Sequence, residues 1–307
     1  MRRVWIAVAT AGLIACGGDG TKQSAPVTTT PVTATASSAP SRPFTVGRRE
    51  VTFEDTSRPI DAARPSRTLR TLLLVPEGPG PFPLVEFSHG VGSSGPGQVG
   101  YLEPIAAAGY VVALPTFPLT SGEGGGWSNL FDYANQPADV YFVIDSVLTL
   151  AADPSDPLHG KIDGDRLAVG GHSLGAMTTM GVAFNSCCAQ QRIDAAIVLS
   201  GVEAPFGSGT FDNRPGVPML LAHGDLDDTI GVTGSEDLFA RATGPTAFVR
   251  YPQGTHSGIL RDANGTLLKQ VVIAWLDKWL LDDSTGFDAL PAAVQTSGIA
   301  SLTTKNL

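Results

Sequence analysis

The stretch from Arg166 to Gly175 constrains this 307-residue chain more than any other. It reads Arg-Leu-Ala-Val-Gly-Gly-His-Ser-Leu-Gly, an apolar β-type run that ends in a Gly-x-Ser-x-Gly pattern and leads into a helix-type run. The glycines allow a sharp turn between strand and helix, and free N–H groups at the helix start face any anion beside the serine. The pattern predicts that Ser173 is a nucleophile on this turn, rather than part of a glycine-rich structural turn.

From residue 43 onward, β-type runs alternate with helix-type runs. This alternation predicts an α/β fold with a mostly parallel sheet and helices on both faces. The length and a hydrophobic content of 42% suffice for one large core, so we expect one folded domain over residues 44–307. Eight strands are predicted near residues 50–54, 69–75, 84–88, 110–115, 166–170, 195–200, 219–223 and 246–251, and five helices near 99–108, 136–151, 174–186, 235–242 and 266–281.

The first 43 residues differ in composition and are expected to form a leader and a tether. Residues 1–15 have two arginines and then an apolar run too short to span a bilayer, which is typical of an export signal. Leu-Ile-Ala-Cys at residues 13–16 resembles the bacterial lipobox, in which the cysteine, here Cys16, is acylated. Residues 16–43, rich in Thr, Ser, Ala and Pro, then suit a tether. We expect a cell-surface or outer-membrane lipoprotein, with an ordinary secreted or periplasmic protein as the alternative.

The formal net charge of −9 limits the partners of the chain. An acidic protein without a basic run is not suited to neutralise phosphates, so no nucleic acid is expected. Membrane contact would come from the lipid on Cys16 and not from surface charge. We expect a monomer without a cofactor or metal ion.

Cys187 and Cys188 are adjacent and allow two interpretations. They are either two small buried residues or a disulfide between neighbours whose Cα atoms lie about 3.8 Å apart. Export favours oxidation. A metal site is not expected, because no histidine or third cysteine is nearby.

A serine nucleophile needs a base, and the base needs an acid that orients it. His256 lies in a Gly-Thr-His-Ser-Gly loop between the last predicted strand and the last predicted helix, where it can reach Ser173. Three carboxylates follow the seventh predicted strand, and one of them must face the histidine. The other histidines are expected to be structural or to point elsewhere, namely His89, His159, His172 and His223.

The order of the elements resembles the α/β-hydrolase fold across residues 45–283. The order Ser173, Asp227, His256 is also the order of that family. In enzymes that this segment resembles, His-Gly-x-x-Asp with an aliphatic residue three positions later selects Asp227 as the acid. Alignment on the Asp-Thr-Ile of cutinases selects Asp228 instead, and Asp225 is a third candidate.

Residues 83–92 resemble the branch that contains platelet-activating-factor acetylhydrolases, dienelactone-hydrolase-like proteins and cutinases or polyester hydrolases. The resemblance implies that the backbone N–H of Val91 joins that of Leu174 in an oxyanion hole. The chain departs from dienelactone hydrolases, which have cysteine at the position of Ser173. It also departs from cutinases, which typically have an aromatic residue at the position of Val91.

Only sixteen residues separate Gly201 from Pro218, which predicts an open cleft without a lid. Trp127, Phe131 and Tyr133 are expected either to line the substrate pocket or to form an aromatic cover over the edge of the sheet. The hypothesis is a serine carboxylic-ester hydrolase that acts through an acyl-enzyme on small-molecule or polymeric esters outside the cytoplasm, polyesters included. The alternatives are a phospholipase or acetylhydrolase, a serine peptidase with the same triad, and a non-catalytic surface lipoprotein.

Overall fold

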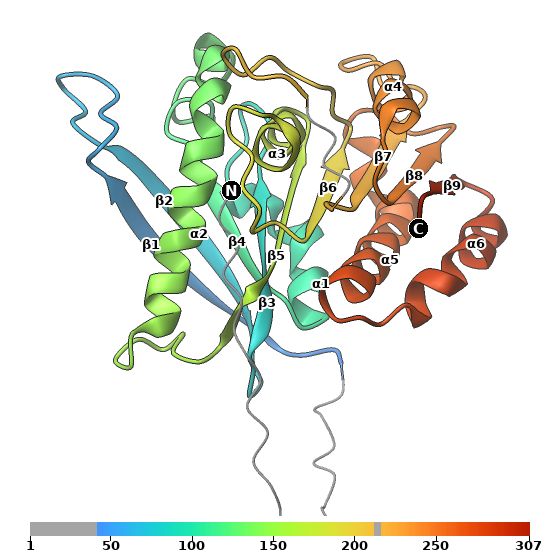
Figure 1. The fold of residues 1–307 in the computed structure, drawn as a ribbon, viewed down its shortest axis with the longest axis horizontal. Coiled ribbons are helices and arrows are strands. Elements are labelled where there is room, and N and C mark those ends of the chain that lie inside the picture. Colours follow the sequence, from blue (N-terminus) through green and yellow to red (C-terminus); the bar gives the residue numbers. More distant parts are fainter. Residues whose placement is uncertain (1–41, 212–215) are drawn as a thin grey trace, which may run out of the picture. The chain divides into compact units, whose positions relative to one another are not determined.

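A nine-stranded β-sheet forms the centre of the molecule (Figure 1). The computed structural model describes residues 42–211 and 216–307. The strand order is β1-β2-β4-β3-β5-β6-β7-β8-β9. Neighbours from β4 to β8 are parallel, whereas β1, β2 and β9 each run antiparallel to a neighbour. The strands are β1 (Val46–Asp55), β2 (Arg67–Pro76), β3 (Phe82–Ser88), β4 (Val111–Thr116), β5 (Ile162–His172), β6 (Ala195–Leu199), β7 (Met219–Gly224), β8 (Thr246–Tyr251) and β9 (Ser301–Lys305).

Helices cover both faces of the sheet (Figure 1). One face packs against α1 and α5, with α6 beside α5, and the other packs against α2, α3 and α4. Burial of each large apolar side chain in these two layers stabilises the fold by about 1.5–3 kcal/mol. The helices are α1 (Val99–Ala107), α2 (Gln136–Ala152), α3 (Leu174–Phe184), α4 (Thr233–Arg241), α5 (Asp262–Leu280) and α6 (Thr285–Ser297).

The central strands explain why the sheet is buried on both sides. Every residue of β3, β4, β6 and β7 is buried, and most of these residues are apolar. Such continuous apolar runs are typical of parallel strands that helices cover on both faces. The edge strand β1 alternates instead between exposed and half-buried residues, since one of its faces meets solvent.

The fold class is the one predicted, with one correction. The sheet has nine strands instead of eight, because β9 and the preceding helix α6 lie beyond the last predicted element. The sequence of β9 is Ser-Leu-Thr-Thr-Lys, and it is largely exposed. A short polar edge strand lacks the apolar run on which strand prediction depends. The described residues between β6 and β7 contain no helix.

Residues 1–41 lie outside the described residues, and they contain the predicted signal segment, the predicted lipidation site Cys16 and all but the last two residues of the predicted tether. Within residues 42–211 and 216–307, no helix combines the length and the apolar character needed to cross a bilayer.

A buried group of ion pairs, here called the Arg67 cluster, consists of Arg67, Asp132 and Asp139. The Arg67 guanidinium donates to both carboxylate oxygens of Asp139, at 2.7 Å each, and to both of Asp132, at 3.0 and 2.7 Å. Burial disfavours the charge, but the hydrogen bonds to Asp139 and Asp132 outweigh it and raise the pKa of Arg67 above its ordinary value. The cluster joins β2 and α2 to the 3-10 segment η2 (Gly126–Asn135), which contains Asp132.

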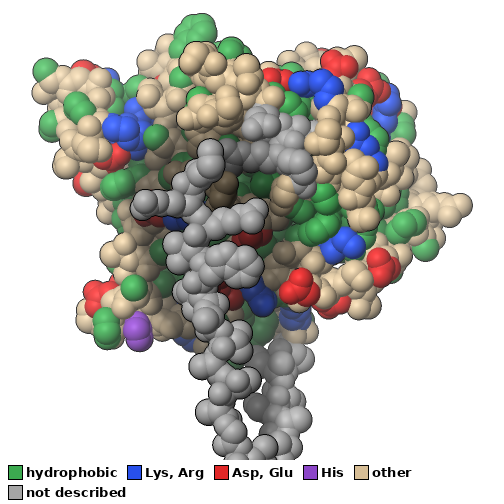
Figure 2. Space-filling model, in the orientation of Figure 1, with side chains coloured by type: hydrophobic (Ala, Val, Ile, Leu, Met, Phe, Trp, Pro, Cys, Tyr) green, Lys and Arg blue, Asp and Glu red, His purple; other side chains and the backbone are tan. Residues whose placement is uncertain are grey.

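Charged side chains on the described surface are mixed in sign. On the face shown in Figure 2, Lys and Arg side chains lie among Asp and Glu side chains rather than in one basic area. Many of these charges form ion pairs across the surface, such as Arg48 with Glu103 at 2.7 Å and Arg241 with Glu203 at 2.7 Å. Exposed pairs of this kind contribute about 0–1 kcal/mol each, so they shape the surface more than they stabilise the fold.

Candidate active site

Ser173 lies on the sharp turn between β5 and α3, as the sequence pattern predicts. Its φ of 59° and ψ of −122° are rarely adopted by residues other than glycine, and such strain is common at functional sites. A Cβ atom on Gly171 would overlap the backbone of Gly175, and one on Gly175 would overlap the carbonyl of Ser88. Both glycines are therefore needed for the backbone to turn this tightly and present the serine hydroxyl.

Three side chains from separate loops form a hydrogen-bonded relay. His256 Nε2 lies 2.8 Å from Ser173 Oγ, and His256 Nδ1 lies 2.7 Å from Asp227 Oδ2. The serine hydroxyl can therefore donate to Nε2, while the Nδ1–H group donates to the carboxylate. The acid that faces the histidine is Asp227, since Asp228 is exposed and Asp225 pairs with Arg250 instead.

The surroundings of Asp227 favour its charged form. Burial alone would raise its pKa, but hydrogen bonds from the N–H of Ile230, from His256 and from the N–H of Thr229 lower the pKa below its usual value. The two backbone donors lie 2.8 and 2.9 Å from Oδ1. His223, whose pKa burial lowers, lies 3.1 Å from the same carboxylate. Asp227 is therefore an ionised, fixed partner for His256.

The predicted oxyanion donors flank Ser173. Neither the N–H of Val91 nor that of Leu174 donates to an acceptor among the described residues. The turn before Val91 approaches the nucleophile closely, since a Cβ on Gly90 would lie 3.2 Å from Ser173 Cβ. His89 anchors this turn, because its Nε2 accepts a hydrogen bond of 3.0 Å from the N–H of Phe117, and burial lowers its pKa to about 4. Two free donors beside a nucleophile are suited to a developing negative charge.

A cavity of about 480 Å³, here called the Ser173 cavity, lies beside the relay. Its size falls within the usual range of small-ligand sites. The lining includes Ser173, His256 and residues of four other segments. The lining residues are Gly90, Val91, Ser93, Gly97, Gln98, Gly100, Tyr101, Trp127, His172, Ser173, Thr229, His256, Ser257, Leu260 and Arg261.

Residues 131–303 match the family described as PETase, PET hydrolase-like. This match covers more than half of the chain. The chain belongs to the PET hydrolase-like family. The family is an α/β-hydrolase type of polyester hydrolase, and membership implies hydrolysis of ester bonds. No curated protein matches the chain.

In this member of the PET hydrolase-like family, two further residues hold His256 in place. His172 Nε2–H donates to the backbone carbonyl of His256 at 2.8 Å, and the Ser200 hydroxyl donates to the same carbonyl at 3.1 Å. Burial lowers the pKa of His172 to about 4, so this ring stays neutral at neutral pH. From the sequence, His172 was expected to be structural or to point elsewhere. Its position next to Ser173 on the turn was the available signal.

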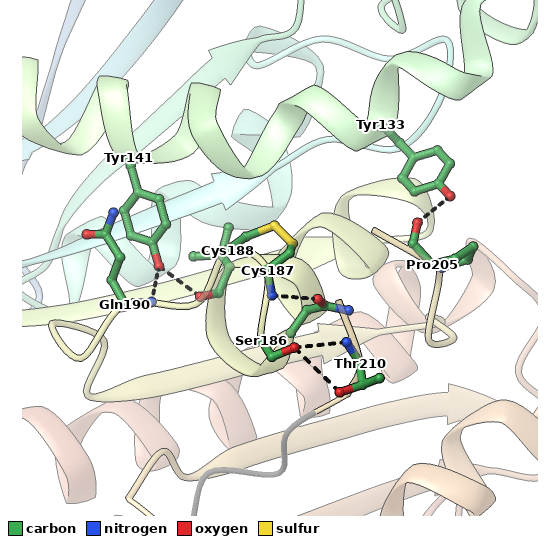
Figure 3. The surroundings of a disulfide bond; sticks show 10 residues. Tyr133, Tyr141, Ser186, Cys187, Cys188, Gln190, Pro205 and Thr210 are labelled. Carbon is green, nitrogen blue, oxygen red and sulfur yellow. Dashed lines mark hydrogen bonds between the residues drawn. A yellow bond between two sulfur atoms is a disulfide. The ribbon is translucent and has the colours of Figure 1, made fainter. Parts of the chain in front are cut away.

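The three aromatic residues of η2 have separate positions. Trp127 lines the Ser173 cavity and is 65% exposed. Tyr133 instead donates to the carbonyl of Pro205 at 2.7 Å (Figure 3). It also packs edge-on against Phe206. Phe131 is 85% exposed and lines no part of the cavity. Of these three residues, the predicted pocket role therefore fits Trp127 alone.

Cys187 and Cys188 form a disulfide in an exposed turn after α3 (Figure 3). The interpretation as two small buried residues is therefore wrong, and the alternative of a disulfide between neighbours holds. Asn185 stabilises the turn, since its Oδ1 accepts a hydrogen bond of 3.0 Å from the N–H of Cys187. Neither cysteine lines the Ser173 cavity. No group of His, Cys, Asp and Glu side chains in the described ranges is arranged to hold a metal ion.

Proposed function

We propose that this protein is a serine carboxylic-ester hydrolase that works through an acyl-enzyme on accessible esters, polyester chains included. The observation that carries the proposal is the relay from Asp227 through His256 to Ser173, with contacts of 2.7 and 2.8 Å. An ionised acid, a base and a hydroxyl in this order are the parts that activate a serine. Membership of an ester-hydrolase family supports the same reaction class.

The proposed reaction has two steps. As Ser173 Oγ attacks the ester carbonyl, His256 Nε2 takes the hydroxyl proton, and Asp227 stabilises the resulting imidazolium. The oxyanion accepts hydrogen bonds from the N–H groups of Val91 and Leu174. The imidazolium gives its proton to the leaving alcohol, which leaves an acyl group on Ser173. A water molecule, activated by the same histidine, then releases the acid.

The form of the cleft supports accessible esters as substrates. The connection between β6 and β7 is short, and its described residues form no helix above the site. Two exposed apolar side chains lie near the relay, since Trp127 lines the cavity and Leu226 precedes Asp227. An open cleft with apolar groups at its rim suits a polymer chain or a small ester better than a substrate that must be enclosed.

The experiment is hydrolysis of an ester panel from acetyl to long acyl, with a polyester film, a phospholipid and a peptide beside it. We expect turnover of soluble esters and release of acid from the film. A serine-directed organophosphate should inactivate the protein, with the adduct on the peptide that contains Ser173. If chelation with EDTA abolished the activity while the organophosphate left it intact, the serine mechanism would be wrong, and residues 225–228 would need to be considered as a cation site.

We further propose that the protein is exported and held at a membrane by a lipid on Cys16. The full-length protein, produced in a bacterial host, should then enter the detergent phase in a partition experiment. Cys16→Ser should move it to the aqueous phase, because the acyl chains supply the membrane affinity. Equal partition of the two proteins would show an ordinary secreted protein instead.

A further inference from the structure

A series of buried hydrogen bonds, here called the Gln136 bridge, connects the two turns that contain the proposed oxyanion donors. Its three side chains, Thr120, Gln136 and Thr178, are each 0% exposed. Gln136 Nε2 donates to Thr120 Oγ1 at 2.7 Å, and Gln136 Oε1 accepts a hydrogen bond from the Thr178 hydroxyl. None of the three residues lines the Ser173 cavity, so none of them contacts a substrate bound there.

One end of the Gln136 bridge reaches the turn that contains Val91. The N–H of Gly92, the residue after Val91, donates to the backbone carbonyl of Thr120 at 2.8 Å. The loop after Thr120 also contacts this turn, because the N–H of Gly122 donates to the carbonyl of Ser93 at 3.3 Å. A Cβ atom on Gly122 would lie only 2.9 Å from the carbonyl oxygen of Gly92. The position of Thr120 therefore affects the position of Val91.

The other end of the Gln136 bridge reaches the start of α3. The Thr178 hydroxyl lies 3.2 Å from the backbone carbonyl of Leu174, the residue whose N–H is the second proposed donor. Thr178 comes one helical turn after Leu174 in α3, and α2, which begins at Gln136, packs beside α3 (Figure 1). A single amide side chain therefore links the two segments that contain the oxyanion donors.

The distance between two oxyanion donors determines how well they bind one oxygen atom. Each donor must lie about 2.7–3.1 Å from the oxyanion, and removal of one donor lowers kcat about a hundredfold to a thousandfold. Val91 and Leu174 follow different strands, β3 and β5, so neither turn alone sets the distance between their N–H groups. A buried polar network whose members have partners is rigid, and it is therefore suited to fix such a distance.

We propose that Gln136 is a positioning residue of the oxyanion hole, which keeps the N–H groups of Val91 and Leu174 at the spacing that the transition state requires. The inference rests on the proposed function, because the oxyanion forms in that reaction. Gln136 acts through Thr120 and Thr178 and makes no hydrogen bond to the relay. Loss of the bridge should therefore slow the chemical step and leave substrate binding and the relay unchanged.

The first test compares Gln136→Leu with the wild-type protein on a soluble p-nitrophenyl ester. We expect kcat to fall about tenfold to a hundredfold, since the donors are displaced and not removed, with KM changed less than about threefold. The pH profile of kcat/KM should keep its midpoint, because the bridge has no contact with His256 or Asp227. A large rise in KM or a shifted pH profile would show a general disturbance of the site and would overturn the inference.

Thr178→Val and Thr179→Val provide a matched pair that decides the question even if Gln136→Leu fails to fold. Both threonines are buried in α3, and each hydroxyl lies near the carbonyl four residues earlier, but only Thr178 contacts Gln136. Thr178→Val should lower kcat about fivefold to twentyfold, whereas Thr179→Val should stay within about twofold of the wild-type value. Equal kcat values in the two variants would overturn the inference. The proposed function would still stand if the wild-type protein hydrolysed the ester.

A binding measurement separates the two proposals. A trifluoromethyl ketone forms an adduct with a serine nucleophile that has an oxyanion, whereas the corresponding alcohol forms none. Gln136→Leu should weaken inhibition by the ketone about as much as it lowers kcat, with affinity for the alcohol unchanged. Equal inhibition of both proteins by the ketone, or equal losses for ketone and alcohol, would overturn the role of Gln136. Absence of a ketone adduct on Ser173 in the wild-type protein would instead contradict the proposed function, and with it this inference.

Discussion

The Arg67 cluster and the surroundings of the Ser173 cavity differ in whether their polar groups have partners within the protein. In the Arg67 cluster, both carboxylates receive two hydrogen bonds from a buried guanidinium. Beside the Ser173 cavity, the backbone N–H groups of Val91 and Leu174 and the exposed Arg261 guanidinium have no partner among the described residues. The difference separates polar groups that hold the fold together from polar groups available to a ligand. Substitutions in the two regions should therefore change different measured quantities.

The largest expected effect comes from Ser173→Ala. Ester hydrolysis should fall about a thousandfold or more, because removal of a triad nucleophile leaves only binding and oxyanion stabilisation. Thermal stability should change little, since the serine at a strained turn contributes little packing. Initial rates and a melting curve on the same preparation give both quantities. Retention of more than about a hundredth of wild-type turnover would exclude Ser173 as the nucleophile.

The second prediction compares the two neighbouring acids. Asp227→Asn should lower kcat on a soluble ester about a thousandfold to ten-thousandfold, because an amide cannot orient and stabilise His256 as a carboxylate does. Asp228→Asn, at an exposed carboxylate away from the relay, should stay within about threefold of the wild-type rate. The role of Asp227 as the acid would be refuted by a clearly larger loss in Asp228→Asn.

The third prediction concerns stability in the Arg67 cluster. Arg67→Met should lower the free energy of unfolding by about 3–5 kcal/mol, because it leaves the buried Asp132 without a cation and Asp139 with Arg58 alone, at 2.8 Å. Arg261→Gln removes the same charge from an exposed, unpaired side chain and should change that free energy by about 0.5 kcal/mol or less. Urea denaturation measures both. Similar losses of stability in the two variants would show that the buried, paired Arg67 contributes no more to the fold than the exposed, unpaired Arg261.

Glu86 is intermediate between the fully paired and the unpaired polar groups. Its buried carboxyl has one partner, the Ser88 hydroxyl, at 2.9 Å. Burial raises its pKa to about 8, against a smaller opposing effect of that hydrogen bond. At a pH between the ordinary pKa of about 4.5 and the raised pKa of about 8, the unfolded chain has lost this proton while the native protein keeps it. Stability from this group therefore falls as pH rises through that window.

Glu86→Gln should abolish this decrease in the free energy of unfolding with rising pH. Between pH 6.5 and 8 the wild-type protein should lose about 2 kcal/mol relative to the variant, because one proton corresponds to about 1.4 kcal/mol per pH unit. This pH range excludes the effect of His89 and His172. Their pKa values are lowered to about 4 in the native protein, so they reduce stability only as pH falls below about 6.5. Urea titrations at the two pH values measure the difference, and parallel pH profiles would show that Glu86 is ionised in the native protein.

The sequence predicted most of the architecture because the buried strands are continuous apolar runs. Ser173 and His256 were identifiable since each lies among glycines directly after a strand. The sequence favoured Asp227 with Asp228 as the alternative, because burial separates these neighbours and spacing does not. Gln98 and Tyr101 were not predicted from the sequence as lining residues of the cavity. Along the chain they look like ordinary residues around a helix start, and only the position of α1 beside the nucleophile turn brings them to the cavity.

The late strand β9 has a consequence for how this molecule meets other chains. It pairs along β8 from Thr246 to Arg250, and β8 leads into the loop that contains His256 (Figure 1). Without β9, the N–H and C=O groups of β8 would form an open edge to which a strand of another molecule can add. Removal of residues 301–307 should therefore cause aggregation that increases with protein concentration, because this polar segment covers the β8 edge and prevents self-association.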